Sequence, residues 1–117
     1  MQIKIPWAKP MFLGKEKEYV AEALASTWIS GGPFVDRLER DFANYCKLKY
    51  ALTASNGTAA LHMAYLALGI GPGDEVVVPG FAFLAAANIA LHVSAKPVFA
   101  EVDPRTWCTN ANEIKKC

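Results

Sequence analysis

The sequence is poor in cysteine and has no long apolar run. Its three cysteines, Cys46, Cys108 and Cys117, form neither a CxxC pair nor a metal-ligand spacing. An odd cysteine count argues against the disulfide framework of a secreted domain and favours a reducing cytoplasm. No stretch reaches the ~20 apolar residues of a membrane span, and residues 1–6 hold no signal-peptide run. We therefore expect a cytoplasmic protein with no metal site and no membrane segment.

A strong charge of one sign is also absent. The formal net charge is +1, and the lysines are scattered apart from the pair Lys115-Lys116. Nucleic acid and anionic membrane surfaces are therefore not expected as partners. Hydrophobic residues make up 53% of the chain and charged residues 20%, which is a globular composition. A chain of 117 residues supplies one domain at most.

The order of the predicted elements indicates the fold class. No GxGxxG fingerprint, Ser-His-Asp order or internal repeat is present. Pro33 suits the first position of a helix, where its missing N–H costs nothing. The run Glu75-Val76-Val77-Val78 does not alternate, which is typical of a strand buried on both faces. The pattern predicts an α/β layered sheet with helical crossovers. Expected helices cover about 15–25, 33–45, 58–68 and 81–91, and expected strands cover 50–54, 75–78 and 96–102.

The most distinctive local feature is Ser55-Asn56-Gly57-Thr58, which follows a predicted strand and opens a predicted helix. The first N–H groups of a helix lack internal partners and carry partial positive charge. A glycine lets an anion approach the backbone, and a hydroxyl adds another donor, so these four residues could form a phosphate seat. An ordinary Asn or Ser helix cap without a ligand is the alternative.

Two phenylalanines, Phe81 and Phe83, follow the Val-rich strand. Ligands of open α/β sheets bind beyond the carboxyl ends of the strands, where an aromatic side chain can stack on a flat ring. The alternative is a pair of core residues. Because the two residues are two positions apart, we expect one of them to face the crevice.

A third feature is the connecting segment Trp28-Ile29-Ser30-Gly31-Gly32-Pro33. Trp, Ser and Gly in a loop can form a binding surface or a subunit contact. The alternative is a corner between two helices with Trp28 as a packing anchor. The sequence alone leaves both interpretations open.

Several motifs follow one another in a fixed order along nearly the whole chain. They are Ile5-Pro6, Gly14-Lys15-Glu16, Ser26-Thr27-Trp28-Ile29-Ser30, Ser55-Asn56-Gly57-Thr58-Ala59-Ala60-Leu61-His62, Leu68-Gly69-Ile70-Gly71-Pro72-Gly73-Asp74-Glu75-Val76, the segment 79–88, and Val98-Phe99-Ala100-Glu101-Val102-Asp103 with Thr106. In this order and spacing they resemble the DegT/DnrJ/EryC1/StrS family of sugar aminotransferases. The segment 27–30 is most similar to the perosamine synthetase branch, which aminates a GDP-linked 4-keto-6-deoxy sugar.

The resemblance implies a fold and a set of site residues. The fold is that of the fold type I enzymes, which use pyridoxal 5'-phosphate (PLP) and form dimers with shared active sites. Gly57 and Thr58 would bind the PLP phosphate, with Asn56 shaping the turn. Phe83 matches the aromatic that stacks on the pyridine ring, and Asn88 a position that supports the site. The residues expected near the sugar substrate or the partner subunit are Trp28, Ile29, Ser30 and Gly31.

The implied reaction is amino transfer from glutamate to a 4-keto- or 3-keto-6-deoxy nucleotide sugar, for surface polysaccharide or related amino-sugar biosynthesis. In this family the Schiff-base lysine lies well downstream, and no lysine here sits in a matching motif, so we assign no catalytic residue. The sequence ends inside a helix predicted after Asn110. We therefore expect residues 1–117 to be the N-terminal segment of the PLP-binding large domain, inactive by itself.

One position departs from the family pattern, because Ala82 stands where a threonine usually precedes the stacking aromatic. The resemblance therefore implies the stacking contact of Phe83, but not the polar contact that the threonine makes near the ring. Two alternatives to the aminotransferase remain. One is a PLP-dependent sugar dehydratase of the same fold, with histidine in place of the lysine. The other is a catalytically inert fragment or binding module.

Overall fold

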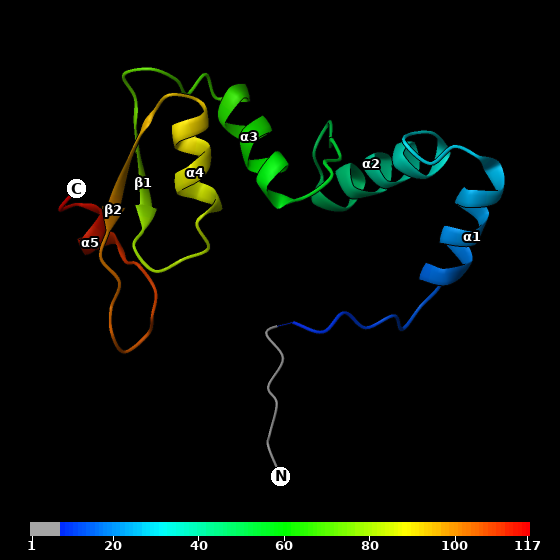
Figure 1. The fold of residues 1–117 in the computed structure, drawn as a ribbon, viewed down its shortest axis with the longest axis horizontal. Coiled ribbons are helices and arrows are strands. Elements are labelled where there is room, and N and C mark those ends of the chain that lie inside the picture. The colour runs from blue at the N-terminus through cyan, green and yellow to red at the C-terminus, as the bar shows by residue number, and fades with distance from the viewer. Residues whose placement is uncertain (1–7) are drawn as a thin grey trace, which may run out of the picture. The chain divides into compact units, whose positions relative to one another are not determined.

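The computed structural model describes residues 8–117, which form two compact units that divide after Thr53. The first unit holds two helices, and the second holds three helices and a small sheet (Figure 1). Each unit has its own packing, and the predicted phosphate seat lies at the start of the second unit.

The first unit is built on α1 (Glu16–Ser26) and α2 (Pro33–Cys46). Pro33 occupies the start of α2, as predicted. Tyr19 of α1 packs on Phe34 of α2 with ring centroids 5.8 Å apart, and the Arg37 guanidinium lies 4.9 Å from the Tyr19 ring centroid. Ala43 is the buried hydrophobic residue among residues 8–53. The apolar residues Tyr19, Val20 and Leu24 of α1 stay largely exposed within this unit.

Residues 50–54 were predicted as a strand, and this prediction is wrong. Lys47 ends α2 in the left-handed conformation, with a φ of 56°, and Tyr50 and Ala51 then lie beside residues of α2. Ala51 and Thr53 are half-buried, whereas Leu52 between them is exposed, so the segment is extended and alternates like a strand. A strand also needs a neighbouring strand, and the sheet in the described residues consists of two other strands.

The second unit contains α3 (Gly57–Ala67), β1 (Glu75–Pro79), α4 (Ala85–His92), β2 (Lys96–Ala100) and α5 (Ala111–Ile114). The two strands pair in parallel, with Glu75 opposite Lys96 and Pro79 opposite Ala100. A parallel pair needs a crossover connection, and α4 supplies it. The core cluster joins α4 and the approach to β2 to α3 and β1. It consists of Ala90, Val93 and Ala95, with Tyr65, Ile70 and Val76 packed against them.

Two predictions about this unit need correction. The Val-rich strand was expected to be buried on both faces, but Val77 is 42% exposed whereas Val78 is 3% exposed. The reason is that α4 packs against the face that carries Val76 and Val78. The fourth helix was expected from residue 81 and begins at Ala85. The Gly80 N–H still donates to the Ala100 carbonyl at 2.8 Å, so the chain follows β2 beyond the strand and turns into a helix later.

The strand β2 ends at Ala100, two positions before the predicted end, and α5 begins directly after Asn110 as predicted. Across the described residues 8–117, none of the helices has the length and apolar character that a bilayer crossing requires. The described structure is thus an α/β arrangement with a parallel sheet, as the sequence predicts.

Candidate functional site

The predicted phosphate seat, defined as residues Ser55, Asn56, Gly57 and Thr58, forms the N-terminus of α3. Asn56 is the extended residue that precedes the helix, and its Oδ1 accepts from the Ala59 N–H at 2.9 Å. The Asn56 carbonyl accepts from the Ala60 N–H at 3.0 Å. Asn56 therefore caps two backbone donors of the first turn, which is the geometry expected of an Asn cap.

The cap leaves two donors of the first turn available. Among the hydrogen bonds of residues 8–117, none comes from the N–H of Gly57 or of Thr58. Both residues are exposed, and a Cβ added at Gly57 would meet no heavy atom within 4 Å. The Ser55 hydroxyl accepts from Asn56 Nδ2 at 3.2 Å and keeps its own proton to donate. Free N–H groups, hydroxyls and open space at a helix N-terminus fit a phosphate group.

A small hollow of about 40 Å³ lies at the carboxyl end of β1. Val78 and Pro79 of β1, Phe83 and Leu84 of the connection, and Phe99 of β2 are among its lining residues. The Phe83 side chain is 81% exposed, so its ring is free to contact a ligand. The hollow and the exposed ring stand where ligands of parallel sheets usually bind.

Phe81 has a different environment. Its ring packs against Trp107 with centroids 5.0 Å apart, and Trp107 lies in the loop that follows β2. Trp107 adopts a φ of 59°, which is uncommon for a bulky residue. Sequence reasoning missed Trp107, although its place after a strand gave the same signal that identified Phe81 and Phe83. Of the two phenylalanines, Phe83 is the one that lines the hollow.

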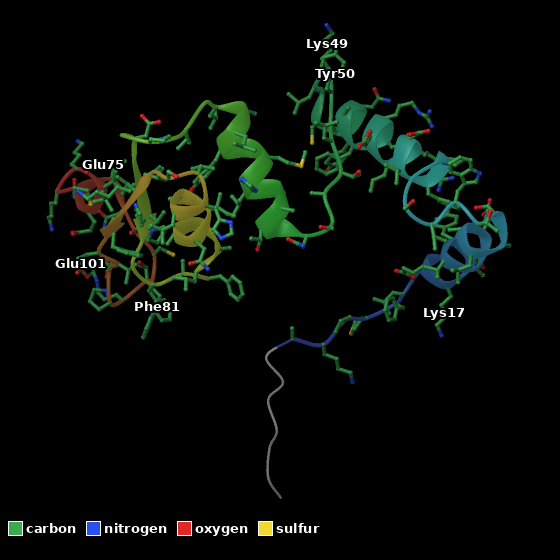
Figure 2. The ribbon with its side chains drawn as sticks, turned by 45° about the horizontal axis from the view of Figure 1, so that its top comes forward. Lys17, Lys49, Tyr50, Glu75, Phe81 and Glu101 are labelled. Atoms are coloured by element: carbon green, nitrogen blue, oxygen red, sulfur yellow. The ribbon has the colours of Figure 1, made fainter. Side chains whose placement is uncertain are left out.

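The seat and the hollow occur at one end of the second unit. In Figure 1, α3 and α4 both begin at the end where the β1 arrow finishes. Figure 2 shows Phe81 and Glu101, which follow β1 and β2, toward that end, whereas Glu75 at the start of β1 lies toward the other. The positive ends of two helix dipoles thus face the same side as the strand ends, and this side is electrostatically suited to an anion.

The residues predicted near the substrate belong to the first unit. Trp28 and Ile29 are 67% and 73% exposed, and Ser30 is also exposed. Trp28 lies so close to Gly32 that a Cβ there would come within 3.1 Å of the Trp28 Cβ, and Gly32 has a φ of 106°. Both observations explain why glycine stands at residue 32 and why the loop can hold Trp28 at the corner between the helices.

One carboxylate at the strand ends is electrostatically distinct. Asp103, after β2, accepts from the Arg105 N–H at 2.8 Å and from its guanidinium Nη2 at 3.2 Å. The hydrogen bond from the Arg105 side chain, followed by that from its backbone, lowers the pKa of Asp103. This pair fixes the turn that carries Trp107. Within residues 8–117, no group of three or more His, Cys, Asp or Glu side chains gathers to hold a metal ion.

Known proteins are similar to this chain over almost its whole length. GDP-perosamine synthases of Caulobacter vibrioides and Escherichia coli O157:H7 are 44% and 46% identical to it over 113 residues. These matches cover 96% of this chain, which spans only 30% and 31% of the length of the two relatives.

Solved structures of aminotransferases are also similar to this chain. A candidate sugar aminotransferase of Streptococcus pneumoniae, solved in its PLP-form, matches with a TM-score of 0.84 and 31% identity over 97% of this chain and 29% of that one. An aminotransferase of Psychrobacter cryohalolentis matches with a TM-score of 0.81 and 34% identity, over 95% of this chain and 29% of that one. Because the model of the DegT/DnrJ/EryC1/StrS aminotransferase family also matches residues 12–117, the chain belongs to that family.

Proposed function

We propose that this chain provides the cofactor-phosphate site and one face of the cofactor-ring site of a PLP-dependent nucleotide-sugar aminotransferase. The observation that carries the proposal is the phosphate seat, in which the Gly57 and Thr58 N–H groups are free and open to solvent. The exposed Phe83 ring, which lines the hollow at the carboxyl end of β1, supports a stacking role. The similar sugar aminotransferase of Streptococcus pneumoniae, solved in its PLP-form, supports PLP as the group that these residues hold.

The residues would act by binding and orientation. The Gly57 and Thr58 N–H groups and the Thr58 hydroxyl would donate to phosphate oxygens, aided by the α3 dipole. Asn56 would keep this turn in shape through its bonds to the Ala59 and Ala60 N–H groups. Phe83 would pack on the flat ring and exclude water from that face. When bound, PLP supplies the electron sink that amino transfer needs.

The proposed reaction of the whole protein moves an amino group from glutamate to a keto carbon of a nucleotide-linked 6-deoxy sugar. The identity of 44–46% to GDP-perosamine synthases favours a GDP-linked 4-keto sugar. We propose that Trp28, Ile29 and Ser30 contact this substrate or a second copy of the chain in a cytoplasmic homodimer. No catalytic lysine is assigned among residues 1–117, so this chain alone is proposed to be inactive. Transamination of a keto sugar by the isolated chain would overturn that division of roles.

Titration of the chain with PLP, followed by absorbance and by phosphorus NMR, tests the cofactor site. Pyridoxal, which lacks the phosphate, is the matched control ligand. We expect PLP to bind more tightly than pyridoxal and its phosphorus resonance to shift on binding. Equal affinity for the two ligands would exclude the phosphate seat.

Two phenylalanine variants test the stacking role. Phe83→Leu should weaken PLP and pyridoxal by the same factor, about fivefold, because ring stacking contributes about 1 kcal/mol. Phe81→Leu is the matched control, since the Phe81 ring packs on Trp107 instead. If the Phe81 variant weakened both ligands and the Phe83 variant neither, the assignment of the stacking residue would be reversed.

A further inference from the structure

We propose that Glu39 is a positioning residue for the cofactor phosphate, because it anchors the segment that leads into the phosphate seat. This inference rests on the function proposed above. Glu39 Oε1 accepts from the Thr53 N–H at 2.8 Å and from the Thr53 hydroxyl at 3.0 Å. Both partners are half-buried, and a carboxylate oxygen that accepts two bonds away from bulk water is held firmly.

The path of the chain shows why one anchor matters here. After α2 the chain turns at Lys49 and Tyr50, which Figure 2 marks at the tip of a loop beside α2. Tyr50 and Ala51 line a groove with Asp36 and Arg40 of α2, so the returning segment lies along the helix that carries Glu39. Thr53 comes opposite Glu39, and the phosphate seat starts two positions later at Ser55.

The bonds to Glu39 are the polar anchor of this approach. Within residues 8–117, the hydrogen bonds that tie residues 50–56 to chain outside the first turn of α3 are the two bonds to Glu39. Ala54 and the four seat residues are exposed and contribute little burial. Removing the Glu39 carboxylate should therefore free the backbone that presents Asn56, and with it the cap and the free donors of Gly57 and Thr58.

Amide hydrogen exchange on the full chain tests this without any ligand. In Glu39→Ala the Ala59 and Ala60 amides, whose partners are both on Asn56, should exchange about tenfold faster, as expected when a bond to a charged group is lost. Glu39→Gln keeps an oxygen that accepts both bonds but loses the charge, so its amides should exchange more slowly than those of Glu39→Ala. Ala43→Gly, a change at a buried site of the same helix, controls for general destabilisation. An equal rise in the Ala43 variant, or none in Glu39→Ala, would overturn the proposal.

Affinities for PLP and pyridoxal then separate this inference from the proposed function. Glu39→Ala should lower the affinity for PLP about tenfold and leave that for pyridoxal unchanged, because the carboxylate acts through the phosphate turn alone. Thr53→Val, which keeps the N–H and loses the hydroxyl, should give a smaller loss in the same direction. A wild-type chain without preference for PLP refutes the proposed function and this inference together. A preference that survives intact in Glu39→Ala refutes this inference alone.

Discussion

Two helices of the second unit begin with the same residue type in nearly the same conformation, yet only one fits an anion. Asn56 before α3 has φ −166° and ψ 170°, and Asn110 before α5 has φ −131° and ψ 169°. Asn110 Oδ1 accepts from the N–H groups of Asn112 and Glu113, whereas Asn56 Oδ1 accepts from Ala59 alone. The second helical position is thus capped in α5 and free in α3.

The surroundings extend this difference. The first turn of α3 contains no acidic residue, and that of α5 contains Glu113. Thr109, before Asn110, gives its hydroxyl proton to the Glu101 carbonyl at 2.6 Å, while the Ser55 hydroxyl only accepts from its neighbour. The helices are 11 and 4 residues long, so α3 has the larger dipole. The asparagine cap of α3 is therefore compatible with a phosphate site because the next N–H donors and the nearby hydroxyl are free. The first turn also carries no negative charge.

Gly57→Glu should weaken the anion site at the start of α3 most strongly. An acidic residue at the first helical position favours the helix dipole, so the fold should be kept, but its carboxylate would repel the phosphate. We expect PLP affinity to fall about 30-fold or more, equivalent to about 2 kcal/mol. Ala111→Glu, at the same position of α5, is the control and should leave PLP affinity unchanged. Equal effects of the two variants in a PLP titration would show that the seat is not special.

Thr58→Ala should have the next largest effect. It removes one hydroxyl donor to a charged group, and such bonds contribute about 1.5 kcal/mol, so PLP affinity should fall about tenfold. Thr58→Ser keeps the donor and should stay close to wild type. Calorimetric titration with PLP measures both, and a Ser variant as weak as the Ala variant would place the contribution in the threonine methyl group instead.

Local signals in the sequence predicted much of this architecture, and long-range contacts account for the rest. Pro33, the Asn56-Gly57 start and the Val-rich run each determine an element through neighbouring residues, and those elements are present. Residues 50–54 have the composition of a strand, but strand pairing depends on a partner that the local sequence does not reveal. The Glu39–Thr53 bond joins residues 14 positions apart, and Phe81 meets Trp107 across two strand ends. Neither contact has a periodic pattern that sequence reasoning can detect.

Removal of the two asparagine caps should have a smaller effect on PLP affinity. Asn56→Ala and Asn110→Ala each lose a side-chain cap, which usually contributes about 1 kcal/mol to helix stability. Only Asn56→Ala should also weaken PLP, by about fivefold, since the turn that presents Gly57 and Thr58 loses its shape. Thermal unfolding and PLP titration of both variants give the two quantities. Loss of PLP affinity in Asn110→Ala would mean that general stability, rather than the seat, controls binding.

The last prediction is a pH dependence of the turn that precedes α5, which the start of α3 should not share. Asp103 precedes α5 in a turn held by Arg105, whose hydrogen bonds lower the pKa of Asp103, whereas the α3 cap is an amide that does not titrate. A lowered pKa in the folded chain means that the stabilising contribution is present above the unfolded pKa of about 3.9 and is lost as the pH falls through the lower folded value. The turn carrying Trp107 should therefore loosen below about pH 4, and Arg105→Gln should raise the pKa of Asp103 toward its ordinary value.

Carboxyl NMR titration of Asp103 and hydrogen exchange of the Trp107 amide measure these two effects. Arg37→Gln is the control, because Arg37 lies over aromatic rings instead. Equal acid sensitivity of the Ala59 amide at the α3 cap would contradict the separation of the two helix starts.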